Sequence, residues 1–163
     1  MNPSELQHLL REFYLERLAL LVQHESAARF ITDYDVNNAY QYVISREETQ
    51  ISWLQHALLD VDLEIPPDPE QREVTPPAKR SDPVKDLSAT AARDNQRFVD
   101  KWRDRVEGVS HARHQGMLRV ILGEMLEHKR LFEQAAEGRT DIIGTALPIN
   151  ERRGKVLDRR WIE

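Results

Sequence analysis

The fold is decided by the stretch LEIPPDPEQREVTPPAKRSD, residues 63–82, which is too rich in proline for a helix and too polar for a core strand. Six of the 8 prolines in the chain fall between residues 66 and 83. On either side of this stretch, apolar residues recur at intervals of three and four, which is the helical period. The stretch therefore predicts a connection between two helical halves of the chain.

We expect two helices before this connection and two after it. Capping residues, proline at a first helical position and glycine at a helix end set the expected boundaries. The four expected helices run from the cap Asn2 to about Ile31, from the turn TDYDVNN onward to about Val61, from near Asp82 to Gly108, and from the cap Ser110 to Gly138.

The length of the connection also has a geometric use. Helices of about 25 residues are roughly 38 Å long at about 1.5 Å per residue. A linker of this size can carry the chain back along that length. The predicted fold is therefore all-α, an antiparallel four-helix bundle over residues 1–138. Its long crossover between the second and third helices covers about residues 63–85, and a C-terminal tail covers residues 139–163.

Length and composition exclude several classes of function. A chain of 163 residues fits one domain. Its net charge of -5 gives no basic field for a nucleic-acid backbone, so no nucleic-acid partner is expected. The chain has no cysteine, which excludes disulfides, thiolate metal sites and cysteine nucleophiles. It has neither a leader pattern at its start nor an apolar run of membrane-spanning length, so we expect a cytoplasmic protein with no membrane partner.

Each expected helix carries an acidic residue near its midpoint, on or beside its apolar face. These residues are Glu16, Glu47, Asp94 and Glu124. Antiparallel packing would bring the four midpoints to one level. Carboxylates buried together must be protonated, paired with bases or bound to cations, because they repel one another and lose hydration. Oxygen-rich sites with one or two nitrogen ligands suit iron or manganese, so this pattern predicts a metal site.

The helix order and three segments carry a family resemblance. With LVQHES in the first helix, REETQISWLQHALLD in the second and EMLEHKRLFEQAAEG in the last, the chain resembles the ferritin-like superfamily, most closely its rubrerythrin-type members. That family builds a paired metal site from a glutamate on each of two helices and a Glu-x-x-His motif on each of the other two. The ligands that the resemblance implies here are Glu16, Glu47, Gln50, Asp94, Glu124, Glu127 and His128.

The chain departs from the family pattern at two positions. Gln50 stands where the second helix should carry a histidine, and in the last helix Glu127 holds the motif position while the imidazole is displaced by one residue to His128. Loss of a nitrogen ligand leaves three alternatives open: one metal held weakly, a site for a single metal, or a vestigial site. His128 follows Glu124 by four residues, so the two share a helix face and can still act together.

Two functions follow as alternatives. The resemblance implies a non-haem iron or manganese protein that oxidises ferrous iron or reduces dioxygen or peroxide, as a di-iron ferroxidase or a peroxide scavenger does. No nucleophile–base pair or nucleotide fingerprint is present, so no catalytic residue is assigned. The alternative is a metal-free ferritin-like bundle that acts as a dimeric interaction or stress-associated protein. In that case Glu124 and His128 form an ion pair, and Asp94 reaches solvent or Arg97.

Two partners are expected. Long bundles with a charged exterior commonly pair, so we expect a homodimer. The tail is basic around a terminal tryptophan, with Arg152, Arg153, Lys155, Arg159, Arg160 and Trp161. Three alternatives stay open for the tail: it docks onto a partner protein, packs across a dimer mate, or is disordered.

Overall fold

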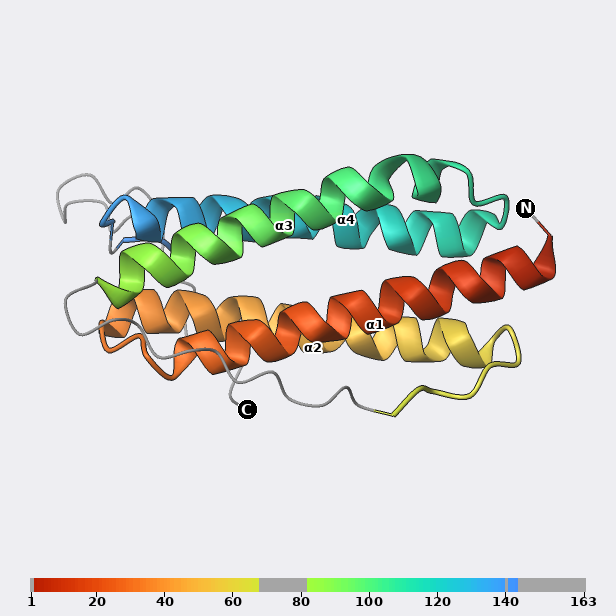
Figure 1. The fold of residues 1–163 in the computed structure, drawn as a ribbon, viewed down its shortest axis with the longest axis horizontal. Coiled ribbons are helices and arrows are strands. Elements are labelled where there is room, and N and C mark those ends of the chain that lie inside the picture. Colours follow the sequence, from red (N-terminus) through yellow and green to blue (C-terminus); the bar gives the residue numbers. More distant parts are fainter. Residues whose placement is uncertain (1, 68–81, 140, 144–163) are drawn as a thin grey trace, which may run out of the picture.

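The computed structural model describes residues 2–67, 82–139 and 141–143. Within these ranges the chain forms four α-helices and no strand. The helices are α1 (Pro3–Ala28), α2 (Tyr34–Leu59), α3 (Pro83–Glu107) and α4 (Ala112–Ala136), arranged as a bundle (Figure 1). The prediction of an all-α four-helix bundle is confirmed. No helix in the described ranges combines the length and the apolar character needed to cross a membrane.

Contacts near the helix ends fix the direction of each helix. Gln7, near the start of α1, donates a hydrogen bond of 2.8 Å to the carbonyl of Val61, just after α2, so these two helices run antiparallel. Arg105, near the end of α3, binds Glu12 in the first half of α1, so α1 and α3 also run antiparallel. It follows that α2 and α3 run parallel, with α3 starting at the opposite end of the bundle from the end of α2 (Figure 1). Two consecutive helices that run parallel require a long crossover such as the sequence predicts, although residues 68–81 lie outside the described ranges.

Local capping chemistry explains where the helices begin and end. Asn2 caps α1 in a reciprocal capping box with Glu5, as predicted. The predicted cap Ser110 is wrong by one residue: the ring of His111 caps α4 by accepting a hydrogen bond of 3.4 Å from the backbone of His114. Gly138 follows α4 with a φ of 84°, a conformation that favours glycine, so this helix ends where predicted. The first helix ends at Ala28, three residues before the predicted Ile31.

Aromatic side chains form two apolar layers inside the bundle. Phe13 packs edge-on against Phe98 and Trp102, with ring centroids 5.0 and 4.9 Å apart. Tyr40 packs against Phe132, with centroids 4.9 Å apart. These layers lie on either side of the middle of the bundle, and that middle is polar.

The predicted role of the tail falls mainly on residues 144–163, which lie outside the described residues.

The cap of α2 provides a test of the fold. Asp33 accepts a hydrogen bond of 2.9 Å from the backbone N–H of Val36. We expect Asp33→Ala to lower the free energy of unfolding by about 1 kcal/mol, because that N–H loses its partner. Asn38→Ala is the control, since Asn38 is exposed on the same helix and its side chain makes no hydrogen bond with any described residue. Urea denaturation followed by circular dichroism measures both variants, and equal stabilities for the two would contradict the capping role.

Candidate functional site

The middle of the bundle contains a fully buried ion pair. Glu47 extends from α2 and Arg17 from α1, and the side chains of both are 0% exposed. The Nη2 atom of Arg17 lies 2.8 Å from Oε1 of Glu47. A buried carboxylate without a positive partner would cost several kcal/mol of free energy, so this contact is the main compensation for burying Glu47.

Two imidazoles complete the surroundings of the Glu47 carboxylate. The Nδ1 atom of His24 lies 3.0 Å from both carboxylate oxygens, and Nδ1 of His128 lies 3.8 Å from Oε1. Burial would raise the pKa of the Glu47 carboxyl, but the charge of Arg17 and the contacts with His24 hold that pKa well below its usual range. Because an ionised carboxylate can only accept hydrogen bonds, His24 donates through Nδ1–H.

A glutamine links the buried pair to the surface. The side-chain carbonyl of Gln50 accepts hydrogen bonds from Nε and Nη2 of Arg17, at 3.0 and 2.9 Å. Its amide group donates to Glu124 on α4 at 2.6 Å, and Glu124 also binds Arg46 on α2. Burial would raise the pKa of the Glu124 carboxyl, but hydrogen bonds from Arg46 and Gln50 lower it. The result is a continuous polar relay from Glu47 through Arg17, Gln50 and Glu124 to Arg46.

In the buried middle of the bundle, several polar atoms have no hydrogen-bond partner within the described part of the chain. They are Nη1 of Arg17, Nε2 of His24, Oδ1 of Asn95 and Nδ1 of His128. Asn95 extends from α3 and donates a hydrogen bond of 3.4 Å to the carbonyl of Met125 on α4. All four helices therefore contribute a buried polar side chain to the middle of the bundle.

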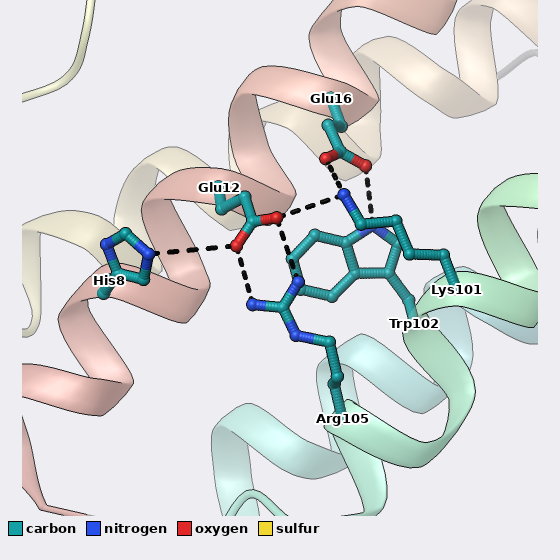
Figure 2. A network of polar contacts seen from close by, with 6 residues as sticks. All are labelled: His8, Glu12, Glu16, Lys101, Trp102 and Arg105. Carbon is teal, nitrogen blue, oxygen red and sulfur yellow. Dashed lines mark hydrogen bonds and ion pairs between the residues drawn. The ribbon is translucent and has the colours of Figure 1, made fainter.

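The structure places Glu16 outside this site. Figure 2 shows its carboxylate between the ammonium of Lys101 and the indole N–H of Trp102, which donates a hydrogen bond of 2.9 Å. The neighbouring Glu12 receives two hydrogen bonds from Arg105, at 3.0 and 2.6 Å. These residues form a network at the boundary of α1 and α3, so Glu16 is not brought to Glu47 as the sequence suggested.

Two further predicted ligands also lie away from the Glu47 carboxylate. Asp94 accepts a hydrogen bond of 2.9 Å from Gln23 and forms an ion pair with Arg97, which the metal-free alternative anticipated. Glu127 is exposed on α4. The structure therefore brings together Glu47, Gln50, Glu124 and His128, but not Glu16, Asp94 or Glu127. The expected ion pair between Glu124 and His128 is replaced by the contact of Glu124 with Arg46.

The donor set does not fit the predicted paired metal site. In the described residues, no group of three or more His, Asp or Glu side chains is arranged to hold a metal ion. The guanidinium of Arg17 lies against Glu47, where a metal cation would bind. The side-chain carbonyl of Gln50 already accepts a hydrogen bond from Arg17, and its amide nitrogen already donates one to Glu124. A metal ion at Glu47 would therefore have to displace a buried positive charge.

Three buried polar residues in the middle of the bundle were not predicted: Arg17, His24 and Asn95. Arg17 and Asn95 each follow directly after a residue that was predicted, Glu16 and Asp94 respectively. The available signal was spacing, because Arg17 and His24 are seven residues apart and continue the buried face of α1. Arginine in such a face is usually solvated, so spacing alone did not mark it as buried.

The buried pair yields the first prediction for this site. We expect Arg17→Met to lower the free energy of unfolding by about 3–5 kcal/mol, because it leaves the Glu47 charge buried without its partner. Arg17→Met/Glu47→Gln should lose less than the sum of the two single variants, since it removes both charges together. Arg11→Met, at an exposed arginine of the same helix, is the control for loss of a positive charge. Additive losses in urea denaturation would contradict the pairing.

The surface network yields a prediction on acid stability. Hydrogen bonds from Arg105 are the largest cause that lowers the pKa of Glu12, from 4.5 to about 2. A carboxyl whose pKa is depressed by folding stabilises the protein above its unfolded pKa, and this contribution is lost as the pH falls toward 2. Glu12→Gln should therefore be less stable than the parent at pH 7 and equally stable near pH 2, as measured by thermal unfolding.

The control for this experiment is Glu64→Gln, since Glu64 is exposed and makes no ion pair within the described residues. The difference in stability between this control and the parent should change less between pH 7 and pH 2 than the difference for Glu12→Gln. A Glu12→Gln variant that differs from the parent by the same amount at both pH values would contradict the role of Arg105.

Comparison with protein-family models, curated proteins and solved structures found no match for this chain. The resemblance to ferritin-like proteins consequently stays a prediction from the residues. The role of Glu47 and its neighbours is therefore inferred from their contacts and their burial.

Proposed function

We propose that this chain is a metal-independent helical bundle that acts as an interaction protein and not as a metal oxidase. The observation that supports the proposal is the guanidinium of Arg17, which lies 2.8 Å from the Glu47 carboxylate in the fully buried middle of the bundle. In the alternative function, that carboxylate is the central ligand of the metal site. Here its negative charge is already balanced within the protein.

Electrostatics argue against simultaneous binding of Arg17 and a metal ion. A divalent cation at Glu47 would lie within a few ångströms of a guanidinium that stays charged, and repulsion at that range is strong in a buried site. If Arg17 moved away, its charge would remain inside the bundle without a carboxylate partner. Either arrangement costs several kcal/mol that the metal–ligand bonds would have to offset.

The remaining groups offer few ligands for a metal. Glu124 is held by Arg46 and Gln50, and Gln50 uses both ends of its amide. His24 uses Nδ1 to contact Glu47, which leaves Nε2, and His128 has Nδ1 without a partner among the described residues. Two imidazole nitrogens without a free carboxylate do not supply the oxygen-rich ligand set that iron or manganese prefers. Under this proposal the polar relay is structural, and function depends on the outer surface.

The proposal predicts the metal content of the protein. Untagged protein, as purified and after anaerobic addition of ferrous iron, manganese or zinc followed by desalting, should retain no stoichiometric metal by elemental analysis. The thermal midpoint should also be unchanged by these metals, since a ligand that binds only the folded state raises that midpoint. Glu47→Gln is the matched control, because it removes the charge of the central carboxylate.

One or two metal ions per chain that are retained by the parent and lost in Glu47→Gln would overturn the proposal in favour of the metal protein. Stoichiometric metal that is retained equally by both proteins would lie elsewhere on the chain and would also contradict metal independence.

A further inference from the structure

A line of exposed residues on α4 faces away from the bundle. Its members are Arg113, Gly116, Val120, Gly123 and Glu127, and all of them are exposed. They are spaced alternately by three and four residues, which places them in one row along the helix. We call this row the α4 outer stripe. It spans four turns, or about 21 Å at about 1.5 Å per residue.

Packing against the described residues does not require either glycine of the stripe. Among those residues, a Cβ atom at Gly116 or at Gly123 would meet nothing within 4 Å. Glycine in the interior of a helix is less stable than alanine by roughly 0.5–1 kcal/mol. Packing within the described part of the chain therefore does not explain why α4 carries two of them. What they provide is bare helix backbone on either side of Val120, which is itself 50% exposed.

The charges of the stripe are arranged symmetrically about Val120. Arg113 lies seven residues before Val120, and Glu127 lies seven residues after it. If a second copy of α4 packs antiparallel about a two-fold axis at Val120, Arg113 of each copy faces Glu127 of the other. In the same arrangement Gly116 of one copy lies opposite the region of Gly123 in the other, so the backbones can approach at the two positions that carry no side chain. Arg119, which lies between the glycines on the helix surface, pairs with Glu107 of its own chain.

The ionic partners that these residues have within the chain do not prevent this pairing. Arg113 contacts Asp60 at 3.2 Å, but both side chains are substantially exposed, and exposed ion pairs contribute little. Glu127 forms no ion pair with any residue that the structure describes. A parallel arrangement of two copies would instead place Arg113 against Arg113 and Glu127 against Glu127.

The geometry points to a homodimer in which the α4 outer stripes of two copies of this chain pack antiparallel about Val120. This inference rests on the proposed function, because it names the partner of the interaction protein as a second copy of the same chain. The exposure of the stripe and its open glycines leave room for a partner, and the self-complementary charges about Val120 favour a second copy over an unrelated protein.

The experiment is sedimentation analysis of the full chain over a range of concentrations. The parent should be a dimer at about 100 μM. Gly123→Arg should weaken the dimer at least tenfold, because a long side chain would enter the contact. Its monomer should remain as stable as the parent or become more stable, since no described residue lies within 4 Å of a Cβ atom at that position.

Charge reversals test the register of the two helices. Arg113→Glu and Glu127→Arg should each weaken the dimer at least tenfold, since each places like charges together across the two-fold axis. The variant that carries both substitutions should dimerise about as well as the parent, because the opposite charges face each other again. Arg103→Glu, an exposed reversal on α3, should leave the dimer unchanged.

A parent that is monomeric at about 100 μM would overturn the inference. A dimer that survives Gly123→Arg, or a double reversal that fails to restore it, would overturn it as well. These results are distinct from failure of the proposed function, which is decided by metal content. A metal-loaded dimer that pairs through α4 would refute the proposed function and leave this interface in place.

Discussion

The structure depends on one electrostatic requirement: the Glu47 carboxylate is fully buried and needs a positive partner. Arg17 meets that requirement from the facing helix at 2.8 Å. Its guanidinium also donates two hydrogen bonds to Gln50, so a single side chain fixes the rotation of α1 relative to α2. A rotation of either helix by one residue would separate the buried charges, at a cost of several kcal/mol, which is a large fraction of the stability of a small domain.

The same requirement extends to the other pair of helices. Gln50 and Arg46 both bind Glu124, so the hairpin of α1 and α2 is joined to α4 by charged and amide hydrogen bonds at the middle of the bundle. Aromatic layers on either side exclude water from this level and strengthen its electrostatic contacts. The buried polar residues lie between two apolar layers, and this order favours one alignment of the α1–α2 hairpin with the α3–α4 hairpin. A shift of one helical turn between the hairpins would place the polar residues among the aromatic rings.

The fold could be predicted from the sequence because its signals are local, whereas part of the site depends on distant partners. Prolines, caps and apolar spacing mark helices without knowledge of the rest of the chain. On α2, Glu47 interrupts an otherwise apolar face, and it is buried as expected. On α1 and α3 the predicted residues were Glu16 and Asp94, but the buried ones are Arg17 and Asn95. One position along a helix is a rotation of about 100°, and no local feature reveals that Arg17 has a buried partner on another helix.

A crystal structure of the protein grown with excess manganese, with anomalous scattering used to locate the metal, would show directly whether Arg17 or a metal ion balances the charge of Glu47. We expect Arg17 to lie within hydrogen-bonding distance of Glu47 and no anomalous peak to lie beside that carboxylate. A peak bound to Glu47 together with His24 or His128, with Arg17 displaced, would contradict this expectation.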